Sequence, residues 1–192
     1  MIVDALTMVG TSINGYRLTA EELLGSMRSN GIDKCVISPV QPKTYHLEPQ
    51  KPAVRLVREA GLLDVSVIVA AGYPWVSHAS QVRALAEQAT DTTIIMSHGG
   101  QINISGLAQA DAFLALEACA NLRIGTNGVY RQDFLEECVE AFGAERVLFA
   151  SMSPVFDQGF ELDRARSIRM DEAARSLVLG ENLTRMLGSS PS

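Results

Sequence analysis

The pattern of hydrophobic and polar positions alternates between short apolar runs and amphipathic segments along the whole chain. Apolar, β-branched runs predict strands over residues 1–9, 33–40, 65–71, 92–97, 122–126 and 146–150. Helical spacing of apolar residues predicts helices over residues 19–30, 53–60, 80–88, 108–119, 133–142 and 171–179. This alternation predicts an α/β fold in which about six parallel strands are joined by right-handed crossovers.

Three segments carry strong local signals. Thr19 and Glu22 have the spacing of a capping box, and Asn30-Gly31 ends the helix that they begin. The strand over residues 65–71 is apolar enough to predict burial of both of its faces, as in parallel sheets. Residues 41–52 hold three prolines and no periodicity, which predicts a loop.

Composition and charge narrow the class of protein. The 192 residues are 47% hydrophobic and 20% charged, which predicts one globular domain over residues 1–188 with a frayed tail over 189–192. A net charge of -6 argues against nucleic acid as a partner. No apolar stretch approaches the ~20 residues of a membrane span. Three cysteines, in apolar or helical contexts, are expected to stay reduced, so we expect a cytoplasmic protein.

Four stretches have the form of a known family. They are Ile2-Val3-Asp4-Ala5-Leu6-Thr7-Met8, Thr93-Ile94-Ile95-Met96-Ser97-His98-Gly99-Gly100, Gly143-Ala144-Glu145-Arg146-Val147-Leu148-Phe149-Ala150-Ser151 and Asn182-Leu183-Thr184-Arg185-Met186-Leu187-Gly188. With these stretches the chain resembles the amidohydrolase superfamily, in the branch of the aminocarboxymuconate-semialdehyde decarboxylase-like enzymes, over residues 1–188. The resemblance implies a TIM-type (β/α) barrel and a metal-dependent hydrolase or decarboxylase.

The chain is short for such a barrel. A complete (β/α)₈ barrel takes about 250 residues, so about two βα units are missing here. The strand ending at Ser38-Pro39 resembles the family's second strand, and the strand over 65–71 resembles its fifth, which places an internal deletion near residues 41–62. We expect a shortened or distorted barrel, either open or closed in a squashed form. Uncovered edges would favour pairing with another chain.

The resemblance also identifies positions that hold metal ligands in the family. Leu6 and Met8 replace two histidines after the first strand, Ala70 replaces a histidine after the fifth, and Met152 replaces an aspartate after the eighth, with Pro154 retained. None of these side chains offers the nitrogen or oxygen that a divalent metal requires. Methionine sulfur suits Cu(I), but methionine more often fills a core. We therefore expect neither a metal nor another cofactor.

One functional position of the family is retained. His98 matches a histidine that acts as acid or base after the family's sixth strand, and it is the candidate catalytic residue. The alternative is a structural hydrogen bond across the Gly99-Gly100 turn. Ser97 is not expected to pair with His98, because neighbouring side chains of a strand point to opposite faces.

Other polar candidates carry weaker signals. His46 and His78 are expected at the surface, and a zinc site made by these two with His98 has no recognised spacing. Trp75, beside Tyr73-Pro74, is either a contact for a partner or ligand or a lid over the barrel mouth.

These observations leave three functional hypotheses. The first is a catalytically degenerate subunit, inactive alone, which binds and supports a full-length amidohydrolase paralogue or a second copy of itself. The resemblance implies this role, since members of the family commonly dimerise. The alternative is an active hydrolase or decarboxylase that uses His98 with His78, Asp157 or Asn127, metal-free or with a relocated divalent metal. A third is a carrier of a small molecule in the vacated apolar pocket.

Overall fold

The computed structural model describes residues 1–11, 15–39, 51–73, 77–101 and 106–188. Its strands are β1 (Val3–Thr11), β2 (Arg17–Leu18), β3 (Lys34–Pro39), β4 (Val67–Val69), β5 (Ile94–Met96), β6 (Leu122–Gly125) and β7 (Val147–Leu148). Its α-helices are α1 (Ala20–Asn30), α2 (Lys51–Leu62), α3 (Ala79–Ala86), α4 (Gly106–Ala118), α5 (Gln132–Phe142), α6 (Gln158–Ser167), α7 (Glu172–Ser176) and α8 (Asn182–Met186). None of these helices has the length and the apolar character that crossing a bilayer requires.

Six parallel strands form one arc. β1 pairs with β3, and β4, β5, β6 and β7 pair in that order, all in parallel. The chain that follows β7 joins the two sheets, because Phe149 O accepts from Ala5 N at 2.9 Å and Ser153 O accepts from Met8 N at 2.7 Å. The arc confirms the expected α/β class with a distorted TIM-type arrangement. The antiparallel pairing of β2 with the end of β1 was not expected.

The arc does not close within the described part of the chain. β3 and β4 each have a hydrogen-bonded strand on one side only, so the opening lies where the resemblance places the missing strands. The expectation that residues 65–71 are buried on both faces was wrong. Val67–Val69 are half-buried and Val65 is exposed, because β4 is an edge strand.

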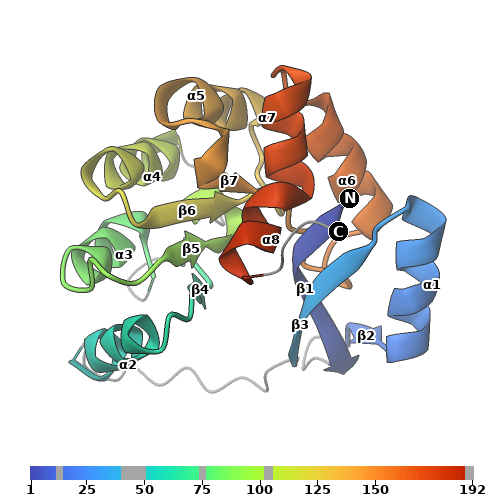
Figure 1. Ribbon diagram of the computed structural model, residues 1–192, viewed down its shortest axis with the longest axis horizontal. Coiled ribbons are helices and arrows are strands. Elements are labelled where there is room, and N and C mark those ends of the chain that lie inside the picture. The colour runs from blue at the N-terminus through green and yellow to red at the C-terminus, as the bar shows by residue number, and fades with distance from the viewer. Residues whose placement is uncertain (12–14, 40–50, 74–76, 102–105, 189–192) are drawn as a thin grey trace.

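Helices cover both faces of the arc (Figure 1). α3, α4 and α5 pack on the outer face of β4–β7 around Ile94, Met96, Leu122 and Ile124. α1 and α6 pack against each other, with Leu23 and Leu162 in one cluster. α8 lies between the two sheets, where its Leu183 joins Ile95 and Leu148 in the cluster inside the arc.

Two helical segments differ from the sequence prediction. α6 was missed because its buried face includes the polar residues Gln158 and Glu161, which weakens the apolar periodicity. The helix predicted over 171–179 continues instead as one helical run up to Met186. α7 and α8 are joined in this run by a π-helical turn over Leu177–Glu181.

Candidate active site at the carboxyl ends of the strands

Three of the four positions that the resemblance assigns to metal ligands lie on adjacent backbones. Met152 N donates to Leu6 O at 2.6 Å, and Met8 N donates to Ser153 O at 2.7 Å, so the end of β1 runs beside the segment after β7. The Met152 side chain is held by the Asn127 amide, whose Nδ2 lies 3.5 Å from the methionine sulfur. The fourth position, Ala70, follows the edge strand β4 and is exposed.

His98 stands in a tight turn rather than in a strand. β5 ends at Met96, and residues Ser97–Gly100 form a 3₁₀ turn in which His98 has φ 56° and Gly99 has φ 57°. This turn brings Ser97 Oγ to 2.8 Å from His98 Nδ1. The expectation that the two side chains point to opposite faces was therefore wrong, because the strand ends one residue before the pair.

Ser97 holds the ring of His98 in place. Ser97 Oγ accepts from Ala71 N at 3.3 Å and makes a hydrogen bond with His98 Nδ1, so one ring nitrogen is engaged by a buried hydroxyl. Burial lowers the pKa of His98 to about 4, so the ring is neutral at pH 7.

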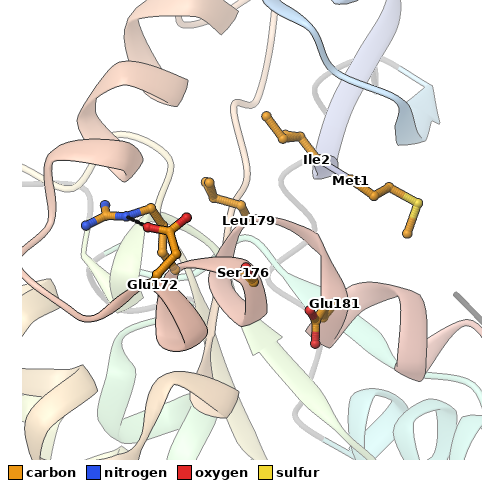
Figure 2. A pocket seen from close by; sticks show the side chains of 7 residues that line it. Met1, Ile2, Glu172, Ser176, Leu179 and Glu181 are labelled. Atoms are coloured by element: carbon orange, nitrogen blue, oxygen red, sulfur yellow. Dashed lines mark ion pairs between the residues drawn. The ribbon is translucent and has the colours of Figure 1, made fainter.

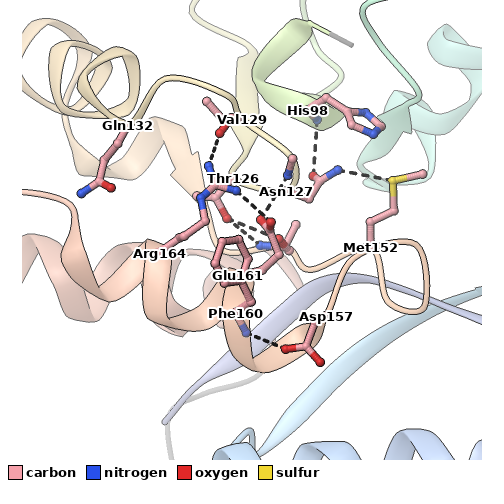
Figure 3. Close-up of polar contacts among 12 residues, drawn as sticks. His98, Thr126, Asn127, Val129, Gln132, Met152, Asp157, Phe160, Glu161 and Arg164 are labelled. Atoms are coloured by element: carbon pink, nitrogen blue, oxygen red, sulfur yellow. Dashed lines mark hydrogen bonds and ion pairs between the residues drawn. The ribbon is translucent and has the colours of Figure 1, made fainter. Parts of the chain in front are cut away.

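Asn127 and Phe156 complete the surroundings of His98. The Asn127 side-chain oxygen accepts from His98 N at 3.3 Å, so one amide links the histidine turn to Met152 (Figure 3). The Phe156 ring meets the imidazole edge to face, with centroids 6.1 Å apart and planes at 74°. Gly128 permits this approach, because its φ of 61° suits glycine and a Cβ there would collide with Phe156. Sequence reasoning named Asn127 but missed Phe156, which carries no family motif.

Asp4 is a structural carboxylate below this site. Its Oδ1 accepts from Leu6 N at 3.1 Å and Ser151 N at 2.9 Å, and its Oδ2 accepts from Gln158 Nε2 at 2.9 Å. Complete burial raises the pKa of Asp4, while the hydrogen bonds from Ser151 and Gln158 oppose that shift. Asp4 therefore ties β1 to the segment after β7 and to α6.

The second buried carboxylate, Glu161, is also occupied. It accepts from Gly128 N at 3.1 Å and pairs with Arg164 Nη1 at 2.8 Å (Figure 3). Burial raises the pKa of Glu161, and the charge of Arg164 opposes that rise. Arg164 also donates to Val129 O, so this pair fixes the loop after β6. Asp157, which the sequence offered as a partner of His98, caps α6 by accepting from Phe160 N at 2.8 Å.

His78, the other proposed neighbour, belongs to the start of α3. Its Nδ1 lies 3.1 Å from Ser80 Oγ, and its Nε2 lies 3.5 Å from Asp111 Oδ2 on α4. Of the three proposed neighbours of His98, only Asn127 makes a hydrogen bond to it. His46, Pro74 and Trp75 lie outside the described residues.

The described side chains at these strand ends do not fit a divalent metal. Leu6 and Ala70 have no donor atom, Met8 and Met152 offer only thioether sulfur, and His98 Nδ1 is engaged by Ser97. Within the described ranges, no three or more His, Cys, Asp or Glu side chains are grouped so that they could hold a metal ion. The three cysteines are free thiols and form no disulfide.

A pocket of about 200 Å³ lies at the opposite end of the strands (Figure 2). Its wall is formed by Met1 and Ile2, just before β1, and by the helical run that begins with α7. Two of its charged groups pair with each other, since Arg175 Nε lies 3.4 Å from Glu172 Oε2, and Arg175 Nη2 also donates to Met170 O at 3.2 Å. This pocket is separate from the strand ends that carry His98.

An arc of parallel strands with helices outside and a histidine turn at the carboxyl ends defines a protein of the TIM-barrel class. The family model described as amidohydrolase matches residues 18–189, and the chain belongs to this family. No curated protein matches the chain.

Solved structures share the fold at low sequence identity. A putative 2-pyrone-4,6-dicarboxylic acid hydrolase from Pseudomonas putida has a TM-score of 0.75 and 12% identity, over 100% of this chain and 99% of that one. A 5-carboxyvanillate decarboxylase from Sphingomonas paucimobilis has a TM-score of 0.67 and 12% identity, over 98% and 99%. A dihydroxybenzoic acid decarboxylase from Polaromonas, solved with bound manganese, has a TM-score of 0.56 and 15% identity, over 88% and 65%.

Proposed function

We propose that this chain is a subunit without metal-dependent catalysis of its own, which binds and supports a metal-bearing member of the amidohydrolase family. The observation that carries the proposal is the set of side chains at the strand ends. Leu6, Met8 and Met152 lie on adjacent backbones where β1 runs beside the segment after β7, and Ala70 takes the fourth position. A hard divalent cation finds no carboxylate or imidazole ligand at any of them.

The state of His98 supports the same proposal. A general base needs a free lone pair and a pKa near the working pH. Burial lowers the pKa of His98 to about 4, and its Nδ1 is engaged by Ser97. A neutral imidazole with this pKa is a weak base at pH 7.

The nearby carboxylates do not supply the missing chemistry. Asp4 accepts hydrogen bonds from two backbone amides and a glutamine, and Glu161 accepts from Gly128 N and pairs with Arg164. Either group would have to give up these contacts to act on a substrate. The scaffold is kept while the reactive set is not, which fits a chain that replaces one protomer of an amidohydrolase dimer.

Co-expression with a full-length amidohydrolase of the same family, with its metal ligands intact, tests the proposal. We expect the two chains to co-elute at fixed stoichiometry. The metal content of the complex should match the amount of the full-length chain alone, because this chain contributes no metal site. We also expect the partner to gain stability or turnover over the partner expressed alone. This chain purified alone should bind no stoichiometric zinc or manganese. A monodisperse chain that is fully active by itself would overturn the proposal.

An enzyme that uses His98 is the second candidate, and the retained histidine turn favours it. The substitution His98→Asn separates the two, because asparagine tolerates the positive φ of this position. A supporting subunit should stabilise or activate its partner equally well with His98→Asn. Stoichiometric zinc or manganese that disappears in this variant, or activity of the isolated chain that is lost with it, would favour the enzyme.

A further inference from the structure

His78, at the start of α3, stands between a hydroxyl and a carboxylate. Its Nδ1 lies 3.1 Å from Ser80 Oγ, and its Nε2 lies 3.5 Å from Asp111 Oδ2. Nucleophilic acyl transfer uses a serine, a histidine that removes the serine proton, and a carboxylate that orients the imidazole ring. Such a triad is recognised by the geometry of its three side chains and not by their order in the sequence.

The packing of α3 on α4 brings these three side chains together. The two helices lie side by side (Figure 1), and Ala79 on α3 and Ala112 on α4 are both fully buried in the outer core. Ser80 and Asp111 are the chain neighbours of these two alanines, so they lie at the rim of the helix pair. His78 immediately precedes the helix, so one short stretch of backbone carries both the imidazole and the hydroxyl.

We propose that Ser80, His78 and Asp111 form a site for acyl transfer, with small neutral carboxylic esters as its substrates. Ser80 Oγ attacks the carbonyl carbon of the ester, and the serine proton moves to His78 Nδ1. The tetrahedral intermediate then expels the alcohol, which takes that proton, and the acyl group stays on Ser80 as an ester. Water hydrolyses this ester in the same way, with His78 as the base, and releases the carboxylic acid. Asp111 is a positioning residue, because it contacts the ring and not the substrate.

The contacts of the imidazole suit this role. An ionised carboxylate only accepts hydrogen bonds, so Asp111 favours a proton on Nε2 of the neutral ring and leaves the Nδ1 lone pair for Ser80. The 3.5 Å contact is long, but catalytic hydrogen bonds often tighten when a substrate binds. Ser80 lies in the first turn of α3, where backbone N–H groups lack partners within the helix. Such groups stabilise the negative oxygen of a tetrahedral intermediate.

Exposure separates this site from the second serine–histidine pair of the chain. Ser80 is exposed, and the side chains of His78 and Asp111 are 29% and 40% exposed, so an ester in solution reaches the hydroxyl. Ser97 and His98 are both buried, which keeps a substrate away from that hydroxyl. A neutral ester fits the open site, because the charge of Asp111 repels an anion. No metal and no strand-end residue takes part, so the inference is independent of the proposed function.

Labelling of the full chain with a fluorophosphonate probe tests the nucleophile. The serine oxygen attacks phosphorus, fluoride leaves with the serine proton, and the probe stays bound to the oxygen. We expect stoichiometric labelling of the wild type at Ser80, located by mass spectrometry of the digested protein, and no labelling of Ser80→Ala. Ser29→Ala is the matched control, because Ser29 is an exposed serine of α1 and its loss should leave the labelling unchanged. A wild-type chain that stays unlabelled, or is labelled at another residue, would overturn the proposal.

Hydrolysis of p-nitrophenyl acetate by the same proteins tests the other two residues. Ser80→Ala and His78→Asn should lower kcat/KM by about tenfold or more, since general base catalysis contributes about 10²–10⁴-fold. Asparagine at position 78 keeps a favourable cap for α3. Asp111→Asn should lower kcat with little change in KM, and Asp111→Glu, which keeps the carboxylate, should retain more activity. Hydrolysis that any one of Ser80→Ala, His78→Asn and Asp111→Asn leaves unchanged, or that depends on His98 instead, would contradict the triad.

Discussion

The closed wall of the arc and its open side are stabilised in different ways. The closed wall, formed by β5, β6, β7 and β1, is held by long-range polar clamps as well as by its core. Arg146 Nη2 donates to Leu116 O at 3.0 Å and Cys119 O at 2.7 Å, and Asn182 Nδ2 donates to Ala144 O at 2.8 Å and Val147 O at 3.0 Å. The open side, formed by β3, β4 and α2, has exposed leucines and strand edges instead.

The difference shows which part of this scaffold carries its stabilising contacts. Asp4, Arg146 and Asn182 all act on the closed wall, where each joins segments that are distant in sequence. α8 fills the space inside the arc next to them, through Leu183 and Met186. The stabilising contacts are therefore concentrated away from the opening.

Removing the Asp4 clamp should have the largest effect on stability. Asp4→Ala leaves Leu6 N, Ser151 N and Gln158 Nε2 without their acceptor, at roughly 1–3 kcal/mol each, partly offset by the desolvation cost that the carboxylate no longer bears. We expect a loss of about 4 kcal/mol in the free energy of unfolding, measured by urea denaturation. Asp4→Asn, which keeps one acceptor oxygen, should lose less. Asp163→Ala, at an exposed carboxylate, should be near neutral, and equal losses at both sites would contradict the clamp.

A leucine of the closed wall should be the next most sensitive position. Leu122 on β6 is fully buried in the outer core, so Leu122→Ala removes packing and leaves a cavity. Substitutions of this kind cost about 2–5 kcal/mol. The same denaturation experiment measures the effect, and a loss below about 1 kcal/mol would show that the wall repacks readily.

The buried neutral His98 should make stability depend on acid pH. Its pKa is about 4 in the folded chain and about 6.5 when unfolded, so between these values the unfolded chain binds more protons. Stability from this group is fully present above pH 6.5 and is lost as pH falls towards 4, by about 2 kcal/mol at pH 5. Burial raises the pKa of Asp4 and Glu161, which gives a dependence of opposite sign, so the reference is the same pH series on His98→Asn.

The wild type should lose about 2 kcal/mol more than His98→Asn between pH 7 and pH 5. Parallel curves for the wild type and His98→Asn would indicate that the imidazole is accessible to protons in the folded chain.

The sequence predicts the alternating framework because strand and helix periodicities are local signals. The capping box of Thr19 and Glu22 is an example, since both of its hydrogen bonds are present at the start of α1. α6 escapes the same reasoning because its buried Gln158 and Glu161 are stabilised by distant partners. Gln158 bonds to Asp4 and to Ser26, neither of which local periodicity connects with it.

The candidate site is predictable in its parts but not in its connections. The resemblance to amidohydrolases gives His98 and the positions of Leu6, Met8, Ala70 and Met152. It does not give the turn that reverses the direction of His98 after Met96, so the bond to Ser97 could not be foreseen. The role of Asn127 as a bridge between His98 and Met152 could not be foreseen either. The bridge joins the ends of three different strands, which come together only in the folded chain.

The smallest effect is expected for a leucine of the open side. Leu62→Ala makes the same chemical change as Leu122→Ala, but Leu62 is 87% exposed and fills no core space. We expect a change within about 0.5 kcal/mol in the free energy of unfolding, as for other surface substitutions. A loss as large as that of Leu122→Ala would mean that Leu62 is covered by other parts of this chain, and the open side would then be closed.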